Sequence, residues 1–231
     1  MRNKIGIFCM ISGALLVLGA AVLFLYNQQE ASRAQKASES LMPQLILEME
    51  QLHEQEKNTG KTENPAETGN AGGQTETNNS GDHDSDASVS NSDNITADSD
   101  KMTTVEMDGQ EYIGFITIPS LELELPIMAD WSYERLKMAP CRYSGSVNSD
   151  DLVLMAHNYP RHFGNISQLS SGDTIIFTDV NGNSTAYEVI ALDVLDPTAI
   201  EDMTAGEYDL TLFTCTYSGQ SRVTVRCDRV S

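Results

Sequence analysis

Three residues in the second half of the chain carry side chains that together could break and remake an amide bond. Cys215 ends the run Thr211-Leu212-Phe213-Thr214-Cys215, Arg222 follows seven residues later, and His157 comes directly after the apolar run 152–156. A thiolate is a good nucleophile, and the thioester that it forms remains reactive towards amines. An imidazole exchanges protons near neutral pH, and a guanidinium offers fixed donors to a developing oxyanion. We therefore predict a covalent acyl-transfer site.

Two of these residues have a competitor of the same type nearby. His162 lies five residues after His157, and Arg226 lies four residues after Arg222 on the same predicted strand. We assign the proton-transfer role to His157 and the oxyanion role to Arg222. Arg226 is expected to be an ordinary solvated strand arginine.

The remaining cysteines show no metal-binding or redox pattern. The chain has four cysteines, and Cys9 lies inside an apolar segment. Cys141, Cys215 and Cys227 show no CxxC spacing, so neither a zinc site nor a thioredoxin-like redox motif is predicted. A disulfide between Cys141 and Cys227 stays open at this point, because an extracytoplasmic location would permit it.

The elements that must position these residues are mostly strands. Short runs rich in Ile, Val, Phe, Tyr and Thr alternate with turn signals, which is typical of an all-β barrel or sandwich. Asn181-Gly182 predicts a type I′ hairpin. The predicted strands are 112–118, 123–128, 152–157, 174–179, 185–194, 209–216 and 222–230, and the predicted short helices are 132–138 and 165–169.

Alternation within the last two strands indicates which side chains share a face. Thr211, Phe213 and Cys215 fall on one face of the first strand. Arg222, Thr224 and Arg226 fall on the polar face of the second. Cys215 and Arg222 can therefore both point outward across a short connection, whereas Cys227 points inward and is expected in the core.

Composition disfavours several other functions. The formal net charge is −20, so no basic surface for nucleic acid is expected. The run Asp179-Val180-Asn181-Gly182-Asn183 hints at a calcium loop, but it lacks the glycine and the glutamate that an EF-hand needs at its sixth and twelfth positions. No metal site and no cofactor are predicted.

The N-terminal part predicts a membrane anchor. Residues 5–26 carry no charge over 22 positions, enough for a helix to span about 30 Å of hydrocarbon. Arg2 and Lys4 precede this run, and acidic sequence follows it, so the positive-inside rule places residues 1–4 in the cytoplasm and everything after Tyr26 outside. A cleaved signal peptide is the alternative, but its apolar region would be shorter and would end in small residues.

Two segments separate the predicted anchor from the predicted domain. Residues 27–56 favour a helical stalk, in which Leu41, Leu45, Met49 and Leu52 recur at helical spacing and could form a short self-associating coil. Residues 57–100 are polar and are predicted to be a disordered acidic linker. We expect neither segment to supply core residues, so residues 101–231 should fold and react alone.

The residues of the predicted site resemble those of the sortase family. Thr211-Leu212-Phe213-Thr214-Cys215 is similar to the family's T-L-x-T-C signature, Arg222 opens a strand as its active-site Arg does, and Ala156-His157-Asn158 matches its catalytic His. The resemblance covers about residues 112–230. It implies an eight-stranded β-barrel with a substrate groove, and it implies a substrate-supporting role for Thr214.

The resemblance also implies an activity and partners. A sortase cleaves a C-terminal sorting signal of the Leu-Pro-x-Thr-Gly type and transfers the protein to a peptidoglycan-precursor or pilin amine. Pilin-polymerising members often have a second, C-terminal membrane segment; this sequence ends at Ser231 after its last predicted strand, which favours wall anchoring. The implied location is the cell membrane of a Gram-positive bacterium, crossed once, with the catalytic domain outside. A non-catalytic binding domain and a cysteine hydrolase are the alternatives.

Overall fold

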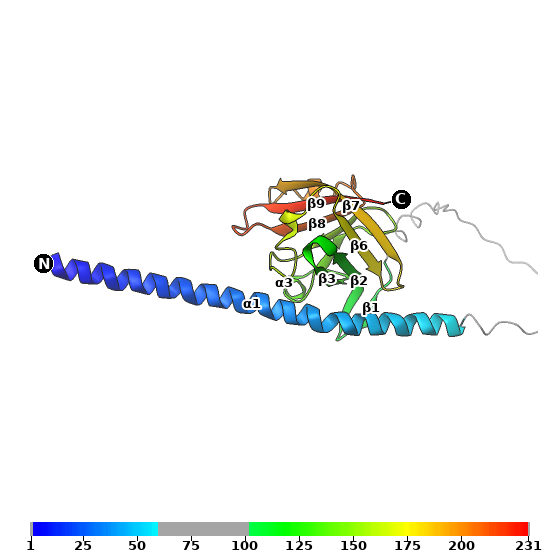
Figure 1. The fold of residues 1–231 in the computed structure, drawn as a ribbon, viewed down its shortest axis with the longest axis horizontal. Helices are drawn as coiled ribbons and strands as arrows, with labels where there is room; N and C mark the ends of the chain where they lie inside the picture. The colour runs from blue at the N-terminus through cyan, green and yellow to red at the C-terminus, as the bar shows by residue number, and fades with distance from the viewer. Residues whose placement is uncertain (1, 60–101, 231) are drawn as a thin grey trace, which may run out of the picture.

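The structure, a computed structural model, consists of one long helix lying against a β-barrel (Figure 1). It describes residues 2–59 and 102–230, so most of the predicted linker lies outside the described residues. The helices are α1 (Arg2–Thr59), η1 (Pro119–Leu121), α3 (Tyr133–Leu136), η2 (Ile166–Gln168) and α4 (Ile200–Met203). The strands are β1 (Val105–Met107), β2 (Gln110–Ile118), β3 (Leu123–Met128), β4 (Cys141–Ser144), β5 (Leu152–Met155), β6 (Thr174–Asp179), β7 (Ser184–Leu195), β8 (Leu210–Cys215) and β9 (Arg222–Arg229).

Eight of the strands close into a barrel. The order is β2-β3-β4-β5-β8-β9-β7-β6, and β6 pairs back onto β2, while β1 extends the β2 edge as a hairpin. An eight-stranded barrel has an interior that side chains can fill. Here the interior holds the main apolar cluster, which includes Ile116, Leu154, Phe177, Leu212 and Val225. The predicted eight-stranded barrel is confirmed.

Closure of the barrel depends on a glycine at the β2–β6 crossing. Gly114 has φ +142 and pairs with Asp179, next to a register shift in β2. A Cβ at this position would collide with the carbonyl oxygen of Thr178. Only glycine therefore lets the two strands approach closely enough to join the first part of the barrel to the last.

All seven predicted strands are present, but β1 and β4 were missed. β4 is only four residues long, as β5 is, but its sequence Cys-Arg-Tyr-Ser lacks the continuous apolar run that marks β5. The predicted hairpin between β6 and β7 is confirmed, but its turn type is wrong. Gly182 is the only residue of the turn with positive φ, whereas a type I′ turn requires positive φ at both central residues.

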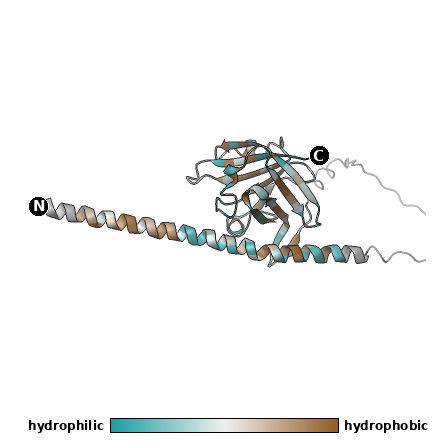
Figure 2. Cartoon of the chain, in the orientation of Figure 1, coloured by the Kyte–Doolittle hydropathy of each residue, from teal (hydrophilic) through white to brown (hydrophobic). Residues whose placement is uncertain are grey.

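The predicted stalk is helical, but it is not separate from the domain. α1 runs unbroken through Pro43, and its second half packs on β1 and β3. Leu41 and Leu45 are buried in a second apolar cluster with Val105 and Met128, and Met49 and Leu52 pack against it. The expectation that the stalk supplies no core residues is wrong, because its apolar stripe is covered by the barrel. Figure 2 shows this stripe as brown patches on the α1 turns beneath the barrel.

The first half of α1 makes no such contacts. Of the described residues, one segment, Met10–Glu30, is long and apolar enough to cross a membrane, and none of it is buried against the domain. This segment overlaps the predicted anchor, residues 5–26, over most of its length.

Candidate active site

Parallel pairing of β5 with β8 brings His157 to the end of the barrel that carries Cys215. Met155 is the register partner of Phe213, so the residues that follow them run side by side. The Ala156 amide donates to the Phe213 carbonyl at 3.2 Å, and the Thr214 hydroxyl donates to the Ala156 carbonyl at 2.8 Å. These two hydrogen bonds tie Ala156, the residue before His157, to Phe213 and Thr214, the two residues before Cys215. The Thr214 side chain is almost completely buried in doing so.

Antiparallel pairing of β8 with β9 brings Arg222 to the same end. Cys215 and Arg222 are direct register partners, and Cys215 is half-buried while the other described thiols are fully buried. The Arg222 guanidinium is held by its own hairpin, donating from Nη1 to the carbonyls of Gly219 at 3.2 Å and Ser221 at 3.3 Å. It has further donors that these bonds do not use.

A groove of about 350 Å³ contains all three predicted catalytic residues. Its walls are largely aromatic and aliphatic: the Trp131 ring stacks on Tyr143 at 6.0 Å, and Tyr143 meets Phe213 edge-on at 5.4 Å. Pro197 and Ile200, from the connection between β7 and β8, close the other side. Sequence reasoning missed these wall residues; the single tryptophan, Trp131, three residues after the end of β3, is the signal that could have pointed to them.

The environment of His157 favours the neutral imidazole. Burial lowers the pKa of His157 from its ordinary value of 6.5, the carboxylate of Glu30 opposes this, and Lys137 lowers it further. At neutral pH the ring is therefore able to accept a proton. The ring lies 5.0 Å from the Tyr159 ring, centroid to centroid.

The competitor His162 lies outside the groove. Its side chain is fully buried beneath α1, with Nε2 3.4 Å from the Ser38 hydroxyl. Burial and then the neighbouring His157 lower its pKa to about 4. His162 thus has no access to substrate, and its place is between α1 and the loop that carries His157.

The competitor Arg226 is also structural, but not in the way expected. It is 4% exposed rather than solvated, because the α4 segment covers this part of the outer face of β9. Its guanidinium donates to Asp193, to Thr211 and to the carbonyls of Asp202 and Met203. It therefore fastens α4, and with it one wall of the groove, to the barrel.

Cys141 and Cys227 are both free thiols in the structure, so the disulfide considered above is not formed. They belong to different apolar clusters, Cys141 beneath α1 and Cys227 inside the barrel. Burial raises the pKa of each thiol to about 12. Neither thiol is suited to act as a nucleophile, and the inward position predicted for Cys227 is confirmed.

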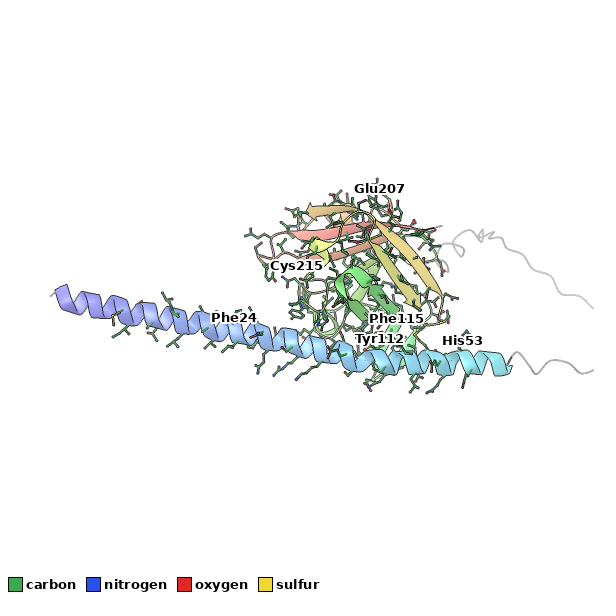
Figure 3. The ribbon with its side chains drawn as sticks, in the orientation of Figure 1. Phe24, His53, Tyr112, Phe115, Glu207 and Cys215 are labelled. Carbon is green, nitrogen blue, oxygen red and sulfur yellow. The ribbon has the colours of Figure 1, made fainter. Side chains whose placement is uncertain are left out.

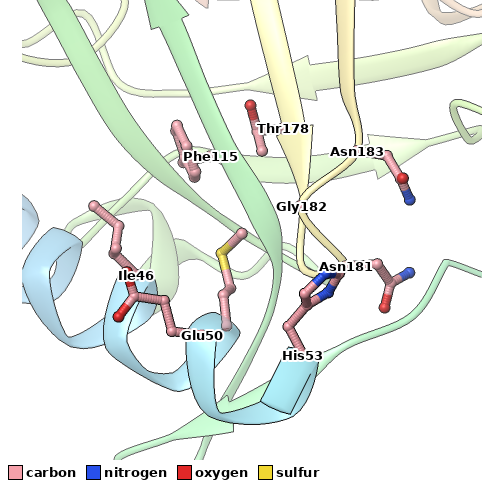
Figure 4. Close-up of a pocket in the computed structure, with 9 residues that line it drawn as sticks. Ile46, Glu50, His53, Phe115, Thr178, Asn181, Gly182 and Asn183 are labelled. Atoms are coloured by element: carbon pink, nitrogen blue, oxygen red, sulfur yellow. The ribbon is translucent and has the colours of Figure 1, made fainter. Parts of the chain in front are cut away.

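A second cavity, of about 430 Å³, lies between α1 and the β6–β7 hairpin (Figure 4). Ile46, Met49 and Phe115 give it an apolar lining, and His53 and Asn183 lie at its edge. Within the described part of the chain, no group of three or more His, Cys, Asp or Glu side chains could hold a metal ion, here or at the groove. Asp179 accepts from the Asn181 and Asn183 amides, so it is used to build the hairpin turn.

Comparison with known proteins points to one family. Residues 116–230 match the family model of the sortase domain. Sortase A of Bacillus anthracis is 29% identical over 123 residues, which are 50% of this chain and 57% of that protein. The chain therefore spans little more than half the length of this relative.

Solved structures of sortases are also similar. Sortase A from Corynebacterium diphtheriae has 26% identity and a TM-score of 0.49, with 53% of this chain and 62% of that chain covered. A pilus-related sortase C of Group B Streptococcus has 27% identity and a TM-score of 0.48, with 55% and 70% covered. The family model covers β3 to β9 and the C-terminal end of β2, including all three groove residues singled out from the sequence. Residues 116–230 are a sortase domain, and through this domain the chain belongs to the sortase family.

Proposed function

We propose that this chain is a membrane-anchored cysteine transpeptidase that cleaves a C-terminal sorting signal and joins the new carboxyl end to an amine. The observation that carries the proposal is the pairing of Cys215 with Arg222 across β8 and β9, beside a His157 that β5 holds at the same groove. The apolar walls of the groove suit the Leu and Pro side chains of a Leu-Pro-x-Thr-Gly signal.

In the first half of the reaction, His157 accepts the thiol proton of Cys215 as the sulfur attacks the carbonyl carbon of the Thr in the signal. The carbonyl oxygen becomes an oxyanion, towards which Arg222 turns its unused N–H donors. The carbon–nitrogen bond then breaks, and the imidazolium of His157 gives its proton to the departing amine. The product is a thioester on Cys215 and a free amine.

The second half runs in the opposite sense with a different amine. The acceptor amine attacks the thioester carbon, and His157 takes the proton that the nitrogen loses. The carbon–sulfur bond breaks, an amide forms and the Cys215 sulfur leaves as a thiolate, which regains its proton from His157. The substrates are surface proteins that bear the signal, and the acceptor is a peptidoglycan-precursor amine or a pilin Lys.

The test is a fluorogenic Leu-Pro-x-Thr-Gly peptide assay with and without an amine acceptor. We expect amide product with the amine, hydrolysed peptide without it and neither with Cys215→Ala, because this variant lacks the acyl carrier. Hydrolysis that ignores the amine would mean a cysteine hydrolase. A folded wild-type protein that binds the peptide without cleaving it would mean a binding domain.

The pH dependence of cleavage gives a separate check on His157. Because burial lowers the pKa of this imidazole from 6.5, the neutral base persists to lower pH than in an exposed histidine. The acid limb of kcat/KM should therefore lie below pH 6.5 and should disappear with the activity in His157→Ala. An acid limb above this value would contradict the assignment of the base.

A further inference from the structure

The second half of α1 is held firmly by the barrel. Leu45 is fully buried in the second apolar cluster, and Leu41 and Met42 are nearly so. Ser38 donates to the Met138 carbonyl at 3.1 Å and lies 3.4 Å from His162 Nε2. Contacts from Ser38 to Leu52 extend over about 21 Å of helix at about 1.5 Å per residue. The domain therefore has one orientation relative to this helix.

The docked part of α1 continues without a break into the part that could span a membrane. The candidate span ends at Glu30, and the first buried docking residue is Ser38. Eight helical residues are about 12 Å long. The barrel is thus fixed close to the place where the helix would leave the hydrocarbon.

The groove lies at the end of the domain that is nearer to the candidate span. Burial lowers the pKa of His157 and raises that of Tyr159, and the charge of Glu30 acts upward on both, so this carboxylate faces the loop that carries the catalytic imidazole. At the other end, the β6–β7 hairpin meets α1 beside His53. Glu30 and His53 are separated by about 35 Å along the helix. Figure 3 shows Cys215 on the side of the barrel towards Phe24 and His53 beneath the opposite side.

The surface around the groove has side chains that suit a lipid headgroup layer. Tyr217 is 93% exposed, Tyr133 is 73% exposed and Trp131 is 41% exposed, although all three lie beside an apolar groove or its hairpin. Tyrosine and tryptophan favour the membrane–water boundary, where the ring is partly dehydrated and the polar atom stays wet. Arg33 and Lys36, just beyond the candidate span, are exposed and would meet lipid phosphates.

We propose that docked α1 holds the groove face of the domain against the headgroup layer of the membrane that anchors the chain, with the lipid bilayer itself as the partner of this face. The proposal rests on the proposed membrane anchoring and on the groove being the active site. It means that the groove opens towards a signal segment just emerging from the bilayer. A signal held far above the membrane surface would meet the end of the barrel that lies opposite the groove.

The only tryptophan of the chain, Trp131, reports directly on this arrangement. The full chain is placed in lipid nanodiscs of phosphatidylcholine and phosphatidylglycerol, with or without a lipid that carries a nitroxide on its headgroup. Nitroxide quenching acts over a short range, so Trp131 fluorescence should be strongly quenched. The matched control is Trp131→Phe combined with Asn183→Trp, which moves the indole to the exposed hairpin at the far end of the domain. Its quenching should be weak.

A second pair of variants tests the role of docking. Leu45→Asp places a charge in the buried contact and should reduce the quenching of Trp131, because the domain is released from the helix. Leu47→Asp puts the same charge on the exposed side of α1, 56% exposed, and should leave the quenching intact.

Equal quenching at the two tryptophan positions, or an unquenched Trp131 in folded wild type, would overturn the proposal. Should Leu45→Asp fail to fold, the comparison of the two tryptophan positions still decides. Failure here is distinguishable from failure of the proposed chemistry, because peptide cleavage by the detergent-solubilised chain does not depend on where the groove lies relative to lipid.

Discussion

Arg222 and Arg226 lie four residues apart on one strand, yet their replacement should affect different properties. Arg226 is 4% exposed and donates to Asp193 at 3.3 Å, to Thr211 at 3.1 Å and to the Asp202 carbonyl at 2.6 Å. An ammonium cannot reproduce this fork of donors, so Arg226→Lys leaves some buried acceptors unpaired. Because the carboxylate of Asp193 is partly exposed, the loss of free energy of unfolding should be moderate, about 2 kcal/mol.

Arg222 is bound only to carbonyls of its own hairpin and lines the groove. Arg222→Lys should therefore change the free energy of unfolding by less than about 0.5 kcal/mol. Its catalytic effect should be large, since loss of one oxyanion donor typically costs about 10²–10³ in rate, or about 3–4 kcal/mol. Folded Arg226→Lys should keep kcat/KM within about threefold of wild type, a difference below about 0.7 kcal/mol.

The assay measures kcat/KM with the fluorogenic signal peptide and the free energy of unfolding from urea titrations followed by circular dichroism, on wild type and both variants. Each variant is the control for the other, because the substitution and the strand are the same. If Arg226→Lys abolished cleavage in a fully stable protein while Arg222→Lys cleaved normally, the oxyanion role would belong to Arg226. Our description of the outer face of β9 would then be wrong.

Three further predictions concern the thiols, the docked helix and the buried histidine. In native protein, iodoacetamide should label Cys215 alone among the described thiols, because burial raises the pKa of the other two to about 12; labelling that persists in Cys215→Ala would contradict this. Leu45→Ala should lower the free energy of unfolding by about 2–5 kcal/mol and Leu47→Ala by less than about 0.5 kcal/mol, and equal urea midpoints would mean that α1 is not docked. Burial lowers the pKa of His162 in the folded state from its ordinary value of 6.5 to about 4. Between these two pH values the unfolded chain binds a proton at His162 and the folded chain does not, so stability is lost as pH falls from 6.5 towards 4. His162→Phe should remove about 3 kcal/mol of that loss, as measured by urea titration across this pH range, and an unchanged pH dependence would refute it.

The docked helix also changes what a shortened protein is expected to do. Residues 101–231 contain the whole barrel, but the second apolar cluster is completed by Leu41 and Leu45 from α1. Removal of the helix would expose Val105 and Met128 to water. The expectation that this part folds and reacts alone rested on a stalk without core residues, and the structure removes that basis.

The sequence by itself determined much of the barrel and the identity of the site residues. Strand alternation is a local property, so it was enough to place Cys215 and Arg222 on one face and Cys227 on the other. The Gly182 turn and the seven predicted strands left clear local signals. The apolar stripe of residues 41–52 was also visible from its spacing.

Only the tertiary structure decided what covers each of these faces. Periodicity marks a face as apolar or polar, but it does not say which distant segment will pack on it. Local pattern alone therefore predicts a free stalk for the stripe of α1 and a solvated side chain for Arg226, whereas the barrel covers the stripe and α4 covers Arg226. The approach of His157 to Cys215 likewise depends on the parallel pairing of β5 with β8, strands that are more than fifty residues apart in the chain and adjacent only in the closed barrel.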